Sequence, residues 1–403
     1  MISQKTTQTL MLFLAIFLSF SLPLSRAGIN LAGFALFIVW ILEGDFKKKF
    51  LQLLTNPFTF SLWLFLIYQI LVYLWVEPDN LKEAISYTFK YVYFLIIFVL
   101  YTSFDVSKVR YLLYAFLAGM FISVLQSFSV YFDIYHFHEI NAKSLSIHMW
   151  HTIYSIFLAF SALLSLLFMI TTKRTILKLL FILLFFFTSA VLFLGISRTG
   201  QVLYIFGLFV LMIKYLGLRG KHIFFALLFT ALVFGMLYQQ NRLFKSRIDV
   251  AKEDIVLLLN KDYCTSLGGR VFTWKVATEV FQHSPILGLG TIDHTDYLLK
   301  AMEDDVAFSK CAIKNLIGYY HSQFIELTAQ SGMIGLFLLL YIFYTLFRTP
   351  INDPLISAMK TIFIVIFFFS FIVDVPFRKM FTLALFSIIS SVILLQSKKE
   401  TPT

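Results

Sequence analysis

Three residues have side chains suited to chemistry on an anion or a hydroxyl group. The first is Arg198, in the segment GISRTG at residues 195–200. A guanidinium binds phosphate in a bidentate manner, and flanking glycines let backbone N–H groups approach the same anion. An arginine at the mouth of a helix pair is costly to hold without a partner. Arg198 is therefore a candidate anion clamp; the alternative is an arginine that only extends to the membrane interface.

The second candidate is Arg270, in the segment LGGRVFTW at residues 267–274. Two glycines precede it and a helical pattern follows, which predicts that Arg270 lies at a helix N-terminus. Free N–H groups and the positive end of the helix dipole favour anions there. The alternative is an ordinary arginine on the surface of a loop helix.

The third candidate is His321, in the segment YYHSQFIELTAQSGMIG at residues 319–335. It lies where a long polar loop returns to an apolar run, and a histidine can act as a general base near neutral pH. Glu326 is predicted to orient the ring if the helix geometry permits, and Ser322 is a second candidate supporting residue. The alternative is an interfacial histidine without chemistry.

The remaining histidines and the glycine pattern give no sign of a metal or a cofactor. The spacings of His136, His138, His148 and His151 do not match a zinc site with supporting cysteines or carboxylates. His283 and His294 are predicted to lie on the loop surface. Gly288-Leu-Gly290 lacks a third glycine, and no GxxxxGK[ST] segment occurs, so ATP or NAD use has no support.

The composition identifies the environment of these residues. The chain has 403 residues, of which 59% are hydrophobic and only 14% charged, whereas soluble domains have about a quarter charged residues. Apolar runs recur from end to end. The net charge of +11 does not indicate nucleic-acid binding, because the basic residues lie in breaks between apolar runs, where they set topology.

We expect an all-α integral membrane protein with about twelve transmembrane helices. The predicted spans lie near residues 9–24, 28–43, 57–76, 83–102, 110–130, 150–170, 177–195, 200–216, 222–239, 324–347, 353–373 and 380–396. This pattern predicts three parts: an N-terminal bundle of about nine spans (1–239), a loop (240–320) and a C-terminal bundle of about three spans (321–403).

The orientation follows from lysines and arginines in the short loops. With the N-terminus in the cytoplasm, the cytoplasmic segments hold fifteen of them: Lys5, Lys47, Lys48, Lys49, Lys108, Arg110, Lys173, Arg174, Lys178, Lys214, Arg219, Lys221, Arg348, Lys398 and Lys399. The opposite short loops hold six: Arg26, Lys82, Lys143, Arg198, Arg378 and Lys379. The bias predicts a bacterial inner-membrane protein with both termini in the cytoplasm and the long loop in the periplasm.

The long loop is predicted to be partly helical. Residues 242–259 form an amphipathic pattern. Residues 270–283 follow a helical period that places one set on a common face: Val271, Trp274, Ala277, Thr278 and Phe281. Pro285 and the Gly288-Leu-Gly290 turn are expected to end the helical region.

The chain has two cysteines, Cys264 and Cys311, and both fall in this loop. In an oxidising compartment they are predicted to form a disulfide. The alternative is a pair of free thiols too far apart to bond.

Three stretches in order resemble the O-antigen ligase family, within the wider group that includes O-antigen polymerases and protein O-oligosaccharyltransferases. One is SRTG at Ser197–Gly200. The next is GGR-x3-W followed by HSPILGLG, from Gly268 to Gly290. The third is His321-Ser322, nine residues, Gly332, two residues and Gly335, leading into an apolar run.

This resemblance implies roles for the candidate residues. Arg198 and Arg270 would bind the diphosphate of an undecaprenyl-diphosphate-linked glycan, and His321 would activate the acceptor hydroxyl. The reaction would transfer a preassembled glycan to a core sugar of lipid A-core at the periplasmic face, in lipopolysaccharide biosynthesis. A glycosyl diphosphate is already activated, so the transfer needs no ATP or metal. Direct displacement would invert the anomeric carbon.

Other functions stay open from the sequence. A glycan polymerase is the nearest alternative, followed by a protein O-oligosaccharyltransferase. A lipid-linked glycan transporter is the alternative of another class. It is disfavoured because the spans contain almost no central acidic residues and no inverted repeat, with Lys90 and Lys360 as their main charges.

Overall fold

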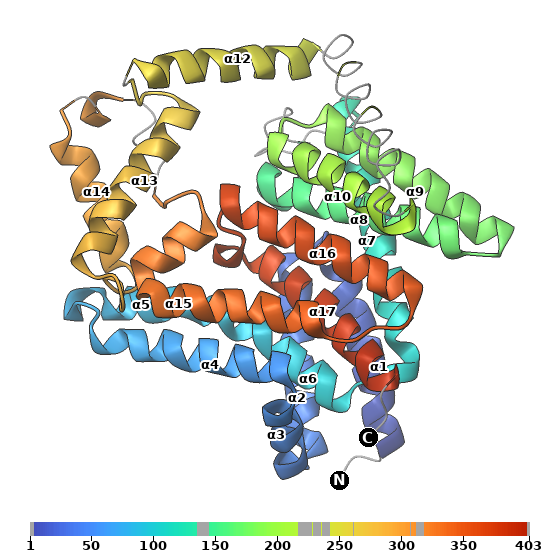
Figure 1. The fold of residues 1–403 in the computed structure, drawn as a ribbon. Helices are drawn as coiled ribbons and strands as arrows, with labels where there is room; N and C mark the ends of the chain where they lie inside the picture. The colour runs from blue at the N-terminus through green and yellow to red at the C-terminus, as the bar shows by residue number, and fades with distance from the viewer. Residues whose placement is uncertain are drawn as a thin grey trace.

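A computed structural model describes residues 4–134, 145–216, 228, 235, 242–260, 262–306, 308–311 and 318–400. Over these residues the chain is helical and contains no strand, which confirms the predicted all-α class (Figure 1). The α-helices are α1 (Gln4–Ser21), α2 (Arg26–Glu43), α3 (Phe46–Thr55), α4 (Pro57–Leu71), α5 (Leu81–Thr88), α6 (Leu95–Ser103), α7 (Val109–Tyr131), α8 (His151–Thr171), α9 (Thr175–Leu194), α10 (Arg198–Leu216), α12 (Arg242–Leu259), α13 (Ser266–His283), α14 (Asp293–Asp304), α15 (Gln323–Arg348), α16 (Pro354–Val373) and α17 (Met380–Glu400).

Within the described ranges, nine helical segments are long and apolar enough to cross a membrane: Arg26–Glu43, Pro57–Leu74, Pro78–Ser103, Val106–Tyr131, His151–Thr171, Thr175–Leu194, Gln323–Arg348, Pro354–Val373 and Met380–Glu400. They confirm a multi-pass membrane protein. A shorter apolar helix, Lys5–Ser21, corresponds to the first predicted span. The predicted span at 200–216 coincides with α10, and the one at 222–239 lies outside the described residues, so the total of twelve stays a prediction.

The helices differ in how much of their surface other helices cover. In α8 and α17, 83% and 89% of the spanning residues are buried, so these two helices form the centre of the bundle. In α9 the share is 28%, and its buried stripe packs on α8 and α7. The other face of α9 exposes leucines and phenylalanines, as a surface in contact with lipid does.

The bundle has two distinct ends. Gln8 at the start of α1 and Lys398 near the end of α17 both donate hydrogen bonds to carbonyl oxygens at the end of α6, at 3.0 Å each. The two ends of the chain therefore lie on the same side, which we call the terminal end (Figure 1). Helices α12, α13 and α14 lie at the opposite side, which we call the loop end.

Helix α12 coincides with the predicted amphipathic segment, and α13 covers the predicted helical stretch, but of the residues placed on a common face only Ala277 is buried. The buried residues of α13 are Gly268, Gly269, Phe272, Thr273, Val276, Ala277 and Val280. Phe272 stacks on Phe308 with ring centroids 4.1 Å apart, while Phe281 of the predicted face is exposed. The segment around Phe308 and helix α14 cover this side of α13, so the tertiary partners decide which face is buried.

The structure joins Cys264 to Cys311 in a disulfide, with Cα atoms 5.1 Å apart. The bond links the start of α13 to the segment that follows α14. It closes a loop of 47 residues, which restricts the unfolded loop by roughly 4 kcal/mol on the chain-entropy account.

Helix α13 ends at His283 as predicted, but the helical region continues with α14. The intervening turn packs into a kink in α15. Leu289 and Gly290 donate backbone hydrogen bonds to the carbonyls of Ala329 and Gln330, at 2.9 and 3.0 Å. Gly332 makes the kink with φ of +62°, and a Cβ there would lie 2.0 Å from the carbonyl oxygen of Ile286. Only glycine fits this position.

Candidate active site

A cleft of about 390 Å³ opens at the loop end of the bundle. The first turns of α8 and α10 form one side, and α12 and α13 form the other. Arg198 of α10 and Arg270 of α13 both line it. The sequence identified these two arginines separately, and the structure brings them to one cavity.

The residues around Arg198 explain its local sequence. The hydroxyl oxygens of Ser197 and Ser155 lie 2.8 Å apart, and both are buried. A Cβ at Gly200 would lie 2.3 Å from the Cβ of Ser155, so only glycine lets α10 approach α8 this closely. Gln201 donates to two carbonyl oxygens at the end of α9, at 3.2 Å each. The neighbours of Arg198 thus fix the start of α10, and Arg198 itself is exposed toward the cleft.

The predicted position of Arg270 at the helix N-terminus is wrong. Helix α13 begins at Ser266, because the Thr265 hydroxyl accepts a hydrogen bond from the Gly268 amide at 3.0 Å and caps the helix there. A Cβ at Gly268 would lie 2.7 Å from the Cα of Tyr263, so the glycine provides close packing. Arg270 is in the second turn, and its charge acts on the cleft through the guanidinium.

His321 lies in a turn that is fixed on both sides. Before it, the Tyr320 carbonyl accepts a hydrogen bond from the indole of Trp274 at 2.9 Å, which ties the turn to α13. After it, the Ser322 hydroxyl donates to the Phe371 carbonyl at 3.1 Å, at the end of α16. His321 has φ of +53°, which is uncommon for a residue with a side chain. Strained residues of this kind cluster at functional sites.

The environment of His321 keeps its imidazole neutral. Burial, and then the positive charge of Arg270, lower its pKa to about 4, against opposing effects of Asp374 and Glu326. Its ring lies 4.3 Å from that of Tyr319. His321 is not among the lining residues of the 390 Å³ cleft that the described part of the chain forms, but it is close enough to Arg270 for their charges to interact.

The carboxylate of Glu326 binds groups other than the His321 ring. It accepts the Tyr320 amide at 2.9 Å and the Arg378 guanidinium at 3.1 Å, and the Nε2 atom of His294 lies 3.5 Å away. Glu326 is fully buried, so these partners offset the desolvation of its charge. In this geometry Glu326 fixes the backbone next to His321. The Ser322 hydroxyl, likewise, is turned toward α16.

Arg378 is a residue of this region that the sequence did not identify as a site residue. Besides Glu326 it donates to the Gly318 carbonyl at 3.1 Å. Its guanidinium carbon lies 5.3 Å from the centre of the Tyr319 ring and 5.5 Å from that of Tyr87. The one signal in the sequence was a pair of basic residues between two closely spaced apolar runs.

One further correction concerns a histidine. His294, predicted on the surface, is buried, and its Nδ1 atom lies 2.9 Å from the Gly290 carbonyl oxygen. His283 is exposed as predicted. The cleft is also lined by His151 of α8 and by Asp254 of α12, a buried carboxylate that the sequence gave no reason to single out.

The fold and this site define a multi-pass membrane protein with a cationic cleft at one end of its helix bundle. Residues 183–340 match the model of the O-antigen ligase family. The match contains Arg198, Arg270 and His321 and confirms the resemblance found in the sequence. No curated protein matches the chain.

Proposed function

We propose that this protein is a glycosyltransferase that moves a preassembled glycan from undecaprenyl diphosphate to a sugar of lipid A-core, in lipopolysaccharide biosynthesis. The observation that carries the proposal is the meeting of Arg198 and Arg270 on one cleft beside a neutral His321. The family match supports the class of enzyme.

The two arginines bind the donor. A diphosphate carries two phosphoryl groups, and arginine stays charged at any physiological pH. When the glycosyl–oxygen bond breaks, negative charge grows on the diphosphate leaving group, which fixed guanidinium groups stabilise. Apolar helix surfaces next to the cleft hold the polyprenyl chain. The reaction uses no metal and no cofactor, because the donor is already activated.

His321 receives the proton of the acceptor. The acceptor hydroxyl oxygen attacks the anomeric carbon, the bond from that carbon to the diphosphate oxygen breaks, and the hydroxyl proton moves to the imidazole. One direct displacement inverts the anomeric carbon. A base with a pKa of about 4 is weak at neutral pH. Because Arg270 contributes to the lowered pKa, a diphosphate bound to Arg270 offsets its charge and raises the pKa of His321.

We further propose that both termini are cytoplasmic and that residues 240–320 face the periplasm of a bacterial inner membrane, between an N-terminal bundle (1–239) and a C-terminal bundle (321–403). The lysine and arginine bias and the Cys264–Cys311 disulfide support this orientation. A cysteine introduced at the exposed Asn260 should react with an impermeant thiol reagent in intact spheroplasts. Labelling only after lysis would reverse the orientation.

The lipopolysaccharide profile of a deletion strain tests the proposed reaction. We expect free lipid A-core together with full-length glycan retained on the lipid carrier. A core carrying one short repeat would indicate a polymerase instead, and an unglycosylated protein with normal lipopolysaccharide would indicate a protein O-oligosaccharyltransferase. Purified protein, donor and acceptor in detergent should give product without a membrane gradient, which a transporter would not.

A further inference from the structure

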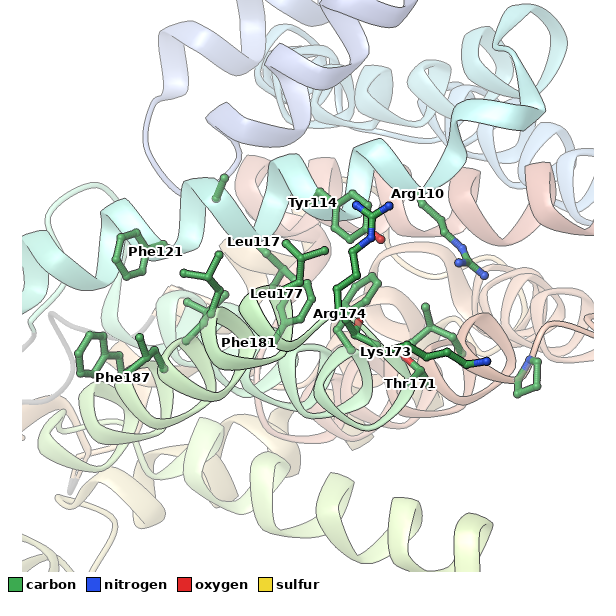
Figure 2. A pocket seen from close by; sticks show the side chains of 18 of the residues that line it. Arg110, Tyr114, Leu117, Phe121, Thr171, Lys173, Arg174, Leu177, Phe181 and Phe187 are labelled. Atoms are coloured by element: carbon green, nitrogen blue, oxygen red, sulfur yellow. The ribbon is translucent and has the colours of Figure 1, made fainter.

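A second cavity, of about 910 Å³, lies on the membrane-facing side of the bundle between α7, α8 and α9. Its walls are apolar over most of their length, with Leu117 and Phe121 on α7 and Phe181, Leu184 and Phe187 on α9. Figure 2 shows Leu117, Phe121, Phe181 and Phe187 along the groove. Nothing in the proposed glycosyl transfer uses this cavity.

Three cations gather at one end of the groove. They are Arg110 at the start of α7 and Lys173 and Arg174 between α8 and α9, at the end away from Phe121 and Phe187 (Figure 2). Arg110 pairs with Asp353 at 2.6 Å. Lys173 and Arg174 are exposed and have no acidic partner within the described ranges. The mouth of the groove therefore carries a net positive charge.

The length of the groove fits one leaflet of a membrane. It extends along α7 from Arg110 to Phe121 and along α9 from Arg174 to Phe187, which corresponds to about 16–20 Å at the helical rise per residue. The hydrocarbon core of a bilayer is about 30 Å thick, so the groove covers one acyl-chain layer and the adjoining head-group region. A polyprenyl chain of many isoprene units is longer than this groove.

The groove opens at the opposite membrane surface from the candidate active site. His151, at the start of α8, lines the arginine cleft, and Thr171, at the end of the same helix, lines the groove. The 21 residues of α8 span about 30 Å, one bilayer core. Asp353, which also lines the groove, lies at the terminal end, because its backbone amide donates a hydrogen bond to the carboxylate of Glu400 at 2.9 Å.

We propose that this groove binds an anionic phospholipid, with its phosphate on Lys173 and Arg174 and its acyl chains along α7 and α9. The charge at the mouth selects an anionic head group, and the apolar walls of one-leaflet length select acyl chains. Basic pockets between transmembrane helices on the cytoplasmic side bind such head groups. In the proposed orientation this groove lies in the cytoplasmic leaflet, but the assignment of the lipid does not depend on the proposed reaction.

Lipid titration of the purified protein in detergent tests the site. Fluorescent phosphatidylglycerol should bind more tightly than phosphatidylcholine with the same chains. The double variant Lys173→Gln/Arg174→Gln should weaken phosphatidylglycerol binding about thirty-fold, because each cation near a membrane surface contributes about a factor of five. Lys178→Gln is the matched control, since Lys178 is an exposed lysine one turn further along α9 that does not line the groove, and it should bind as the unaltered protein does.

A second variant tests the acyl-chain part of the site without changing charge. Ala118 is an exposed small residue in the groove wall, and Ala118→Trp should fill the groove and weaken the binding of both lipids. Equal binding of the two lipids to the unaltered protein, or unchanged binding by Ala118→Trp, would overturn the proposal. If undecaprenyl phosphate displaced phosphatidylglycerol at a concentration below that of the phosphatidylglycerol, the groove would be assigned to a polyprenyl lipid instead.

Discussion

The two ends of the helix bundle both carry arginines, but they hold them in different ways. At the loop end, Arg378 is bound to a buried carboxylate and a backbone carbonyl, and Arg270 lowers the pKa of the half-buried His321. At the terminal end, Lys173 and Arg174 are exposed at the mouth of an apolar groove. Cations that converge on a polar cleft beside a histidine suit a reaction in which charge develops, whereas exposed cations beside apolar walls suit the binding of lipid.

The backbone shows the same contrast. At the loop end, His321 and Gly332 both have positive φ, and the turn between α13 and α14 is inserted into the kink of α15. At the terminal end, α7 and α9 are regular helices without such residues in the groove walls. The difference predicts that substitutions at the loop end affect catalysis or folding strongly, while those near the groove do not affect transfer.

The largest expected effect is that of His321→Ala on the chemical step. Loss of the proton acceptor should slow single-turnover transfer by about 100-fold or more, the usual scale of general-base catalysis. Donor binding should stay nearly intact, because the arginines remain. The two quantities should be measured separately. Loss of donor binding with surviving chemistry at saturating donor would place His321 in the diphosphate clamp instead.

Arg270→Lys should lower donor affinity and transfer by about tenfold to a hundredfold. A point charge replaces a bidentate fork, and a hydrogen bond to a charged group is worth about 1.5–3 kcal/mol. Lys275→Gln on the same helix is the control, because Lys275 is exposed and does not line the cleft. Equal losses in the two variants would show that the effect is not specific to the guanidinium of Arg270.

Gly332→Ala should destabilise the protein. The positive φ alone costs about 1–3 kcal/mol for a residue with a side chain, and the added Cβ would meet backbone atoms of the inserted turn. Thermal unfolding in detergent should show a lower midpoint. Gly33→Ala is the matched control, since a Cβ at Gly33 meets nothing within 4 Å in the middle of α2. A midpoint unchanged in both variants would show that the kink is not needed for stability.

The smallest expected effect is that of pH on the unaltered enzyme. With the pKa of His321 at about 4, the imidazole stays neutral above that pH, so kcat/KM should be nearly constant from pH 8 to 5 and should fall only as the pH approaches 4. A histidine with the ordinary pKa of about 6.5 would already lose most activity by pH 6. Arg270→Gln removes a charge that lowers this pKa, so its acid limb should move to higher pH. If the acid limb of the pH profile is unchanged in Arg270→Gln, the charge of Arg270 does not affect the pKa of His321.

The sequence determined most of what depends on neighbouring residues. Apolar runs of membrane length give the all-helical class and the span positions of α2, α8 and α16, because hydropathy and helix period are local properties. The three chemical residues stood out because of their local segments: glycines beside Arg198 and Arg270, and the return of the polar loop to an apolar run at His321. The amphipathic pattern of α12 was also visible in the sequence, because helix period is a local property. The helical period of α13 was visible in the sequence, but which face of it is buried was not, because the segments that pack on it are distant in the chain.

Only the tertiary structure decided which residues meet. Arg198 and Arg270 share a cleft because Ser197 and Gly200 pack α10 on α8, a contact that no local pattern specifies. The buried state of His294 and the pairing of Glu326 with Arg378 arise where four separate segments converge. Burial and the positions of nearby charges depend on atoms distant in the chain, and they lower the pKa of His321. For that reason the sequence supplied the reactive groups, and the packing of helices decided how those groups are arranged.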